Sequence, residues 1–448
     1  MAWKQYPAYR NSGVAWLGEV PAGWQIRKLR ECGRIFGGLT PSMEDLSFWD
    51  GSIPWITPKD MKRPILADAQ MHVTEKALEE TRLPIVPPNS VLLVVRGMIL
   101  ARRVPIARTV VQATVNQDMK AIVPVDDIDP AFLVYLLESA NEAFVPLIEE
   151  AGHGTKRLPT ERWRQISFAF PAKEEQSVIV TYLDRETARI DALLAKKERL
   201  IALLREKRIA LISRAVTEGL NPSAPMKDSG IGWLGDVPAH WEIKRLKYLA
   251  TIQTGVAKGQ NLAGIETVTL PYLRVANVQD GYLDLTDISV IEVPKKDVHR
   301  YLLQNGDVLM NEGGDEDKLG RGAVWNGEID PCIHQNHVFA VRAKTLEQAR
   351  WIDLITLSSY AKSYFEQKGK RTTNLASISS SNIRELPVMF PPEVERRQIL
   401  DYTMKRGEEI DTAISMIRNS RDKLEEYRTT LISAAVTGKI DVRSEVPA

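Results

Sequence analysis

Residues 12–29 read SGVAWLGEVPAGWQIRKL, and residues 229–246 read SGIGWLGDVPAHWEIKRL. The two segments share the order WLG-x-VP and a second tryptophan three residues after the proline. They begin 217 residues apart, and self-similarity at a fixed offset indicates an internal repeat. The chain therefore contains two diverged copies of one unit.

The repeat extends well beyond this opening motif. At the same offset of 217 residues, three further features correspond: the apolar runs 91–93 and 308–310, Thr155 with Thr372, and Leu158 with Leu375. After a short insertion the offset becomes 220, and LISRAVTEG at 211–219 matches LISAAVTGK at 431–439. Each copy is thus a globular domain followed by a conserved segment.

The conserved segments, at about 171–217 and 394–437, have the composition of long helices. They are rich in Leu, Ala, Lys, Arg and Glu, and the first lacks Gly and Pro after Ala172. A stripe with alternating steps of four and three residues is typical of a coiled-coil seam, so each helix has a natural partner in the other. We predict that the packing positions are Ile190, Leu194, Ile201, Leu204, Leu211, Ile410, Ile414, Ile417, Leu424 and Leu431.

Glycines mark the ends of both predicted helices. Gly219 and Gly438 follow them closely, and glycine readily adopts the left-handed conformation that ends a helix. The sequence NPSAP at 221–225 then has the composition of a linker. A helix over 174–217 spans roughly 65 Å at about 1.5 Å per residue, which is the length of a spacer.

Each globular copy is predicted to be mixed α/β. Short β-rich runs lie at 91–95, 110–114, 120–125, 272–275, 308–311 and 338–341. Helical stretches at 131–150 and 347–367 follow the strands at similar places in the two copies. The middles of the copies share little sequence, so a common scaffold carries different loops. Two domains that recognise different target sequences need this arrangement.

Bulk properties restrict the class of protein. The 448 residues suggest two to four domains, and 44% hydrophobic and 26% charged residues are ordinary for a globular chain. The net charge of +1 neither supports nor excludes a nucleic-acid partner. Cys32 and Cys332 form no Cys-x-x-Cys pair, which fits a reducing compartment. Without a signal peptide or a long apolar run, we expect a cytoplasmic protein with no membrane partner.

Basic side chains provide candidate DNA contacts. Arg96, Arg102, Arg103 and Arg108 lie within 81–117, a stretch that has no Asp or Glu. Guanidinium groups suit phosphate oxygens and pair bidentately with guanine, although a solvated loop explains the cluster equally well. Further candidates, chosen by repeat position or by residue type in loops, are Lys156, Arg157, Arg274, Asn277, Lys318, Arg321, Lys370 and Arg371.

Catalytic constellations in the sequence are weak. Cys332, His334 and His337 lack a fourth ligand cluster for zinc, so we expect no metal site. Asp307, Glu316 and Lys318 resemble a magnesium nuclease centre, but such triplets arise often by chance. No phosphate-cradling loop is present. A magnesium-dependent nuclease and a structural coiled-coil adaptor remain the alternatives to a non-catalytic DNA-binding module.

The order of motifs resembles the specificity subunits of type I restriction-modification systems. It runs WLGEVPAGW, a variable domain, GTKRLP, a Phe-Pro pair with Gln176 after it, an Ile-Asp helix and LISRAVTEG, and then begins again. The resemblance covers nearly the whole chain. The second copy departs from it by RTTNLAS in place of GTKRLPT and by two residues fewer between Gln398 and Ile410.

The resemblance implies two tandem α/β target recognition domains and two long helices packed as an antiparallel coiled coil with a pseudo-two-fold repeat. It implies that each domain reads one half of a bipartite double-stranded DNA target and that the chain has no catalytic residues. It implies two methyltransferase subunits and restriction subunits as partners, with S-adenosylmethionine, ATP and Mg²⁺ bound by those partners. The implied segments are recognition domains at 1–170 and 229–391, helices at 171–219 and 392–448 with the C-terminal tail, and a linker at 220–228.

Overall fold

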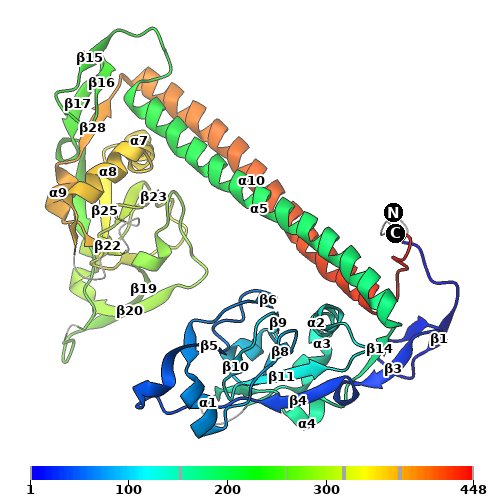
Figure 1. Cartoon of the computed structure of the whole chain (residues 1–448). Helices are drawn as coiled ribbons and strands as arrows, with labels where there is room; N and C mark the ends of the chain where they lie inside the picture. Colours follow the sequence, from blue (N-terminus) through cyan, green and yellow to red (C-terminus); the bar gives the residue numbers. More distant parts are fainter. Residues whose placement is uncertain (1–2, 151–153, 260, 315–318, 372–375, 446–448) are drawn as a thin grey trace. The chain divides into compact units, whose positions relative to one another are not determined.

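The computed structural model describes residues 3–150, 154–259, 261–314, 319–371 and 376–445. The chain forms two compact units (Figure 1). Unit 1 comprises Met1–Lys196 and Asn419–Ala448, and unit 2 comprises Lys197–Arg418. Each unit therefore combines one globular domain with a segment of both long helices.

The long helices are α5 (Lys173–Thr217) and α10 (Glu393–Val436), close to the predicted bounds. Both begin just after a Phe-Pro sequence, and both carry acidic residues in the first turn, where the positive end of the helix dipole lies. Both end before a glycine with positive φ, which is +76° at Gly219 and +73° at Gly438. The prediction of two long helices is confirmed.

Within each unit the two helix segments run antiparallel. In unit 1, Trp24 bonds to Glu175 at the start of α5, and the same indole lies against Gly438 at the end of α10. In unit 2, Trp241 bonds to Glu395 at the start of α10 and lies against Gly219 at the end of α5. The opening tryptophan motif of each domain thus packs where one helix begins and the other ends.

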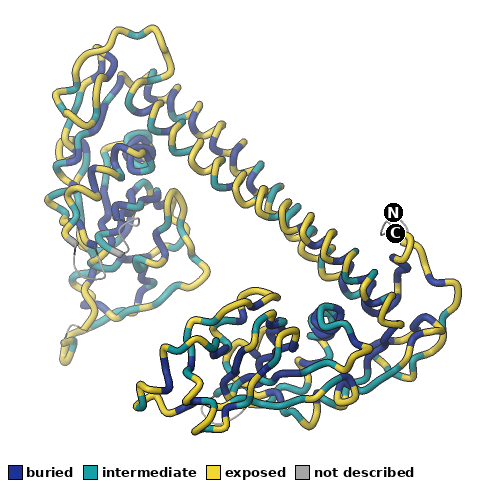
Figure 2. The backbone as a smooth tube through the Cα atoms, viewed as in Figure 1, coloured by how far each residue is buried: buried dark blue, intermediate teal, exposed yellow. Residues whose placement is uncertain are grey.

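Burial recurs along one stripe of each helix (Figure 2). In unit 2, Ile201, Ile410 and Ile414 form a small buried cluster. Half-buried residues complete the stripe on both sides of this cluster. All ten apolar positions predicted for helix packing are buried or half-buried, namely Ile190, Leu194, Ile201, Leu204, Leu211, Ile410, Ile414, Ile417, Leu424 and Leu431.

The unit 1 domain is built on a five-stranded sheet in the order β4-β11-β8-β9-β6. A second sheet has the order β10-β5-β7, and β3 pairs with β14. The strands are β3 (Gln25–Lys28), β4 (Gly33–Gly37), β5 (Trp49–Ile56), β6 (Ile65–Leu66), β7 (Met71–Val73), β8 (Val91–Val94), β9 (Ile106–Thr109), β10 (Thr114–Val115), β11 (Met119–Pro124) and β14 (Ser167–Phe170). The hairpin β1 (Tyr9–Asn11) and β2 (Glu19–Pro21) precedes them, and α1 (Glu75–Thr81) and α4 (Thr160–Trp163) are short.

The unit 2 domain repeats this plan with a four-stranded sheet, β18-β25-β21-β23, and a three-stranded sheet, β20-β19-β24. Here β17 pairs with β28, as β3 does with β14. The strands are β17 (Glu242–Arg245), β18 (Ala250–Thr254), β19 (Thr267–Leu273), β20 (Ser289–Pro294), β21 (Asp307–Asn311), β23 (Gly322–Val324), β24 (Ile333–His334), β25 (Val338–Ala343) and β28 (Pro387–Phe390). The hairpin is β15 (Met226–Asp228) and β16 (Asp236–Pro238), and α6 (Val298–Tyr301) and α9 (Ser380–Arg384) are short.

Close backbone approach explains one glycine in each copy. A Cβ on Gly38 would lie 1.6 Å from the carbonyl oxygen of Val115, and a Cβ on Gly255 would lie 2.0 Å from that of His334. Gly38 lies against β10, which pairs in parallel with β5, and Gly255 lies against β24, which pairs in parallel with β19. The shared crossing supports one core plan for both domains.

The domain helices are shorter than predicted. The stretch 131–150 contains α2 (Pro130–Ser139), α3 (Asn141–Phe144) and a 3-10 turn, because the α-helical conformation is lost at Ala140. The stretch 347–367 contains α7 (Leu346–Thr356) and α8 (Ser359–Lys368), because Ser358 caps a new helix by accepting the Ala361 amide. The predicted strand at 110–114 is also wrong, since residues 110–113 connect β9 to β10 and only Thr114 is in a strand.

In the part of the chain that the structure describes, no helix is long and apolar enough to span a bilayer.

Candidate nucleic-acid interface

A small hairpin gathers part of the predicted basic cluster in unit 1. It consists of β12 (Glu149–Glu150) and β13 (Lys156–Arg157). Leu158 N donates to Val95 O over 2.8 Å, and Gly97 N donates to Lys156 O over 3.0 Å. These bonds fasten the hairpin to the end of β8, where Arg96 pairs with Arg157 in a β-bridge.

The resulting surface exposes cationic groups beside apolar ones. Arg96 and Arg157 are exposed and form no ion pair among the described residues, whereas Lys156 binds Glu150 over 2.7 Å. That bond holds the pKa of Glu150 below its usual range. Met98, in the adjoining 3-10 turn Met98–Ala101, is 66% exposed. Arg102, which follows the turn, is exposed as well.

The structure separates two arginines from this hairpin. Arg108 is half-buried, donates to Asn89 Oδ1 over 2.9 Å and lines a pocket beside α5. Arg103 lines a neighbouring pocket that also contains Glu138 and Arg428. The arginines of the acid-free stretch therefore lie at two different sites. Arg96 and Arg102 lie at or beside the hairpin, whereas Arg103 and Arg108 line pockets.

The matching hairpin in unit 2 corrects the repeat alignment. There β26 (Lys370–Arg371) and β22 (Gly313–Gly314) both pair with β27 (Ala376–Ser377), and Ile378 N donates to Glu312 O over 2.7 Å. Ile378 therefore takes the place of Leu158, and Ala376–Ser377 that of Lys156–Arg157. Lys370, which is exposed, lies on the opposite strand of its hairpin. The predicted counterparts Thr372 and Leu375 lie outside the described residues.

Among the other unit 2 candidates, Asn277 belongs to the scaffold. Asn277 is 3% exposed, its Oδ1 accepts the Arg274 amide, and its Nδ2 donates to the carbonyls of Asp284 and Asp287. Asn277 is therefore a buried structural residue and not an exposed DNA contact. Arg274 is bound to Asp287 over 2.8 Å, and Arg321 is half-buried beside Gln279. Lys318 lies outside the described residues, as does the position of the Arg371 side chain.

The residues of the zinc alternative are engaged in the fold. Burial raises the pKa of the Cys332 thiol to about 12 and lowers that of His334 to about 4. His334 Nδ1 lies 2.6 Å from Val338 O, and His337 Nδ1 lies 2.6 Å from Glu312. Among the described residues, no three His, Cys, Asp or Glu side chains are grouped as a metal site requires.

The nuclease alternative fails at its central residue. Asp307 is fully buried, and both of its carboxylate oxygens accept hydrogen bonds from Arg342 over 2.7 Å. Asp307 Oδ2 also accepts the Gln304 amide, so this carboxylate is satisfied by the fold. Glu316 and Lys318 lie outside the described residues.

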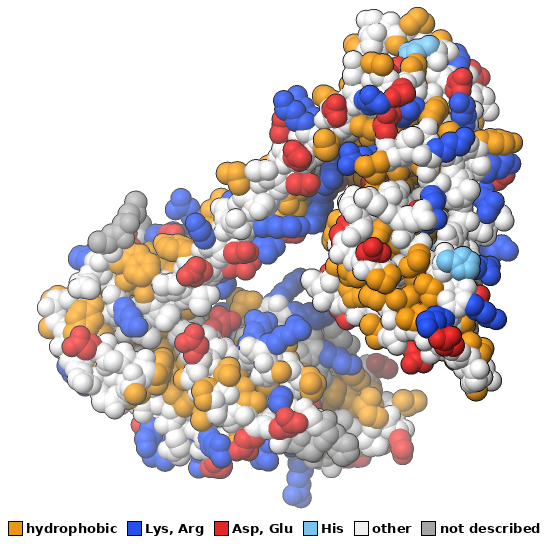
Figure 3. Space-filling view, turned by 180° about the vertical axis from the view of Figure 1, so that it is seen from behind, with side chains coloured by type: hydrophobic (Ala, Val, Ile, Leu, Met, Phe, Trp, Pro, Cys, Tyr) orange, Lys and Arg blue, Asp and Glu red, His pale blue; other side chains and the backbone are white. Residues whose placement is uncertain are grey.

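Charges of both signs are interspersed on the face drawn in Figure 3. This arrangement agrees with the net charge of +1. A nucleic-acid contact on such a surface depends on local groups like the unit 1 hairpin, because the total charge supplies little attraction.

Comparisons with known proteins agree with the repeat. The family model described as type I restriction modification DNA specificity domain matches twice, over residues 21–202 and 238–415. The chain is 24% identical to the MjaIX type I restriction enzyme specificity subunit of Methanocaldococcus jannaschii, over 84% of this chain and 85% of that protein. It is 21% identical to the EcoKI specificity subunit of Escherichia coli K12, over 96% of this chain and 92% of that protein.

A solved structure shares the fold. It is described as the basis of complex assembly and conformational transition of the type I R-M system, and it superposes with a TM-score of 0.66 at 16% identity, covering 93% of this chain and 98% of that one. The two matches of the family model cover most of the chain and coincide with the two repeats. The chain belongs to the type I restriction modification DNA specificity domain family.

Proposed function

We propose that this chain is the DNA specificity subunit of a type I restriction-modification complex and that each recognition domain reads one half of a bipartite target. The observation that carries the proposal is the repeated family match, one over each domain with the first part of its helix. Relatives that align over most of their length are named specificity subunits.

Differences between the domains support different half-sites. Unit 1 exposes Arg96 and Arg157 on its hairpin, whereas the matching strands of unit 2 carry Gly313 and Ser377. Guanidinium groups read guanine or position phosphates, and a shared scaffold with different side chains recognises different bases. The proposed DNA-binding set is Arg96, Arg102, Arg103, Arg108, Lys156, Arg157, Arg274, Lys318, Arg321, Lys370 and Arg371.

Partner subunits supply the chemistry in this proposal. Two methyltransferase subunits carrying S-adenosylmethionine dock along α5 and α10, and restriction subunits that use ATP and Mg²⁺ join for cleavage. The target adenine is flipped out of the duplex into the methyltransferase. The complex operates in the cytoplasm, with recognition domains at 1–170 and 229–391 and conserved helices at 171–219 and 392–448.

The test is a map of adenine methylation in cells that express the full chain with its methyltransferase subunit. The proposal expects one split motif with a methylated adenine in each half. It also expects no methylation when either protein is expressed alone. Methylation without this chain, or at an undivided motif, contradicts the proposal.

A further inference from the structure

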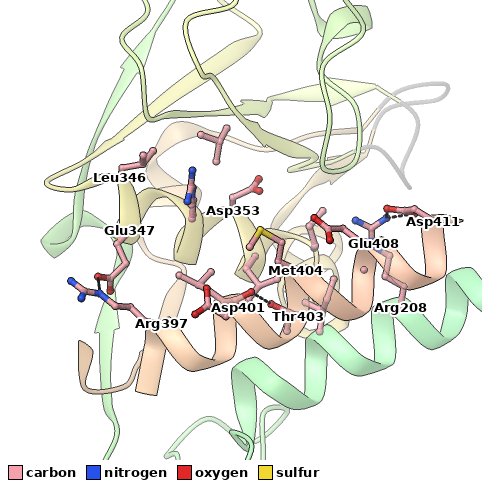
Figure 4. Close-up of a pocket in the computed structure, with 17 residues that line it drawn as sticks. Arg208, Leu346, Glu347, Asp353, Arg397, Asp401, Thr403, Met404, Glu408 and Asp411 are labelled. Atoms are coloured by element: carbon pink, nitrogen blue, oxygen red, sulfur yellow. Dashed lines mark hydrogen bonds and ion pairs between the residues drawn. The ribbon is translucent and has the colours of Figure 1, made fainter. Parts of the chain in front are cut away.

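A pocket of about 610 Å³ lies within unit 2, where α7 faces α10 and the end of α5. Figure 4 shows Asp353 on α7 opposite Met404 and Glu408 on α10, with Arg208 reaching across from α5. Arg208 is already engaged, because its Nη1 lies 2.8 and 3.0 Å from the two carboxylate oxygens of Asp411. The pocket is thus closed on one side by an ion pair between the two helices.

Unit 1 contains a pocket of about 270 Å³ at the repeat-equivalent place. Four residues of α5 line this pocket, and the residues 220 positions later on α10 line the unit 2 pocket. Arg428 replaces Arg208 and binds Asp191 over 3.0 Å, as Arg208 binds Asp411. The corresponding wall positions are Asp184 with Met404, Thr187 with Gly407, Ala188 with Glu408, and Asp191 with Asp411.

Each pocket holds a desolvated carboxylate on its domain helix. Asp353 Oδ1 is buried and accepts no hydrogen bond from the described residues, and burial, with a smaller effect from Asp280, raises the pKa of this carboxyl to about 7. Glu138 on α2 forms no side-chain hydrogen bond or ion pair among the described residues, and burial raises its pKa, although Arg428 and Arg103 are near enough to oppose that rise. When the N-caps Asp129 and Thr345 are aligned, Glu138 and Asp353 differ by one position. Both carboxylates are half-buried, and Asp353 is the more costly of the two, because a buried oxygen without a hydrogen bond destabilises the fold unless another group satisfies it.

The unit 2 pocket favours a cation as that group. Asp401 and Glu408 also line it and form no ion pair within the described part of the chain. Five acidic and three basic side chains line the pocket, and two of the basic ones, Arg208 and Arg397, are already paired with acids. Leu346 and Met404 add exposed apolar surface, at 42% and 57% exposure. A lysine or arginine with its aliphatic stem matches this combination.

We propose that these two pockets are matched docking sites and that each receives one basic side chain from one copy of the methyltransferase subunit. This inference rests on the proposed function, since it takes the partner from there. Two repeat-equivalent pockets in one chain suit two identical partners. Asp353 and Glu138 are the acidic anchors, and the Arg208–Asp411 and Arg428–Asp191 pairs hold the pocket walls in place.

Gly407 lines the unit 2 pocket and provides a variant that fills it. A Cβ there meets its nearest atom, Arg208 Nη2, at 3.8 Å, an ordinary contact. Gly407→Leu fills the pocket and improves helix propensity within α10. Thr412→Leu, on an exposed part of the same helix, is the matched control. Asp353→Asn removes the anchor charge, and Glu366→Gln on the exposed face of α8 is its control.

The experiment counts methyltransferase subunits bound to the full chain by native mass spectrometry of the co-expressed complex. The inference expects two copies on the unmodified chain, one on Gly407→Leu, and roughly tenfold weaker binding of one copy to Asp353→Asn. Both controls should bind two copies, and Asp353→Asn with Glu138→Gln should weaken both.

The possible failures are distinguishable. If the unmodified chain binds no methyltransferase subunit, the proposed function fails. If it binds two copies and the Gly407→Leu and Asp353→Asn chains do so with unchanged affinity, the docking inference is overturned while the proposed function stands. Binding of a single copy to the unmodified chain also overturns the claim of two matched sites.

Discussion

Trp241 donates its indole Nε1–H to Glu395 over 3.1 Å, which ties the opening motif of the second domain to the first turn of α10. Trp24 and Glu175 form the same contact in unit 1 over 3.3 Å, and Tyr6 donates to the same carboxylate oxygen over 2.8 Å. The last tryptophan of the repeated WLG-x-VP-x-x-W motif therefore attaches each domain to the start of the helix that follows it by a Trp–Glu hydrogen bond.

Replacement of Glu175 should weaken this attachment of the first domain to α5. Glu175→Leu leaves the Tyr6 hydroxyl and the Trp24 indole without their acceptor, which costs about 1–3 kcal/mol of unfolding free energy. Urea unfolding followed by tryptophan fluorescence measures the effect. Glu174→Leu, at the exposed neighbouring position, is the control. Equal stability of the two variants contradicts a stabilising role for the Glu175 hydrogen bonds.

The helix seam should be sensitive to cavity formation. Ile201 is 2% exposed within the isoleucine cluster, so Ile201→Ala should cost about 2–4 kcal/mol. Leu200 is 45% exposed, and Leu200→Ala should change stability by less than about 0.5 kcal/mol. Thermal unfolding monitored by far-UV circular dichroism compares the pair. A similar loss in both variants rules out the assigned seam.

The close backbone crossings should tolerate no side chain. Gly255→Ala places a Cβ 2.0 Å from a carbonyl oxygen, so the second domain must deform, and we expect loss of soluble folded protein or a much lower melting temperature. Gly232→Ala serves as the control, because no atom lies within 4 Å of its Cβ. Soluble yield and melting temperature are measured for both variants. Values for Gly255→Ala equal to those of the unmodified chain contradict the close approach of Gly255 to the His334 carbonyl.

Asp353 should make stability depend on pH. Its pKa is about 7 in the folded chain, against about 4 in an unfolded one, so the folded state binds more protons in between. Its contribution to stability is fully present below about pH 4 and is lost as the pH rises through 7. Asp353→Asn should therefore stabilise the isolated chain at pH 8, by on the order of 2 kcal/mol, with little effect at pH 4. The test measures the difference in melting temperature between Asp353→Asn and the unmodified chain at pH 8 and at pH 4. An equal difference at the two pH values contradicts the prediction.

The hairpin arginines should contribute electrostatically to DNA binding. Arg157→Gln should weaken binding of the mapped target duplex and lower the slope of log affinity against log salt by about 1 for one lost phosphate contact. Fluorescence anisotropy of the complex with its methyltransferase subunit measures both quantities. Arg189→Gln, at an exposed position of α5, should change neither. An unaltered salt slope in Arg157→Gln removes this residue from the interface.

Long-range periodicity made the scaffold predictable from the sequence. The seam positions and both helix bounds follow from a pattern repeated over many turns, and the β-rich runs predicted at 91–95, 308–311 and 338–341 lie in or overlap the central strands β8, β21 and β25. The connection at 110–113 contains two valines but forms an isolated bridge at Ala113 and no strand, because topology overrides local propensity there. Breaks at Ala140 and Ser358 depend on local capping, which a 3.6-residue pattern does not reveal.

The candidate site was less predictable, because side-chain pairing depends on tertiary neighbours. Asn277 and Arg274 have residue types suited to base contact, yet the fold uses Asn277 as a buried hydrogen-bonding centre. The structural counterpart of Leu158 is Ile378, three residues beyond the predicted Leu375, so Lys370 and Arg371 lie on the other strand of the hairpin. Glu138 and Asp353 were missed, and their only signal in the sequence was an acid beside the apolar face of a short helix.

The central claim is that each domain reads its own half of a divided target. The most direct test exchanges residues 30–170 for the corresponding segment of another family member and maps adenine methylation in cells that express the hybrid with the same methyltransferase subunit. The account predicts that one half of the split motif changes while the other half is retained. A motif that changes in both halves, or in neither, contradicts it.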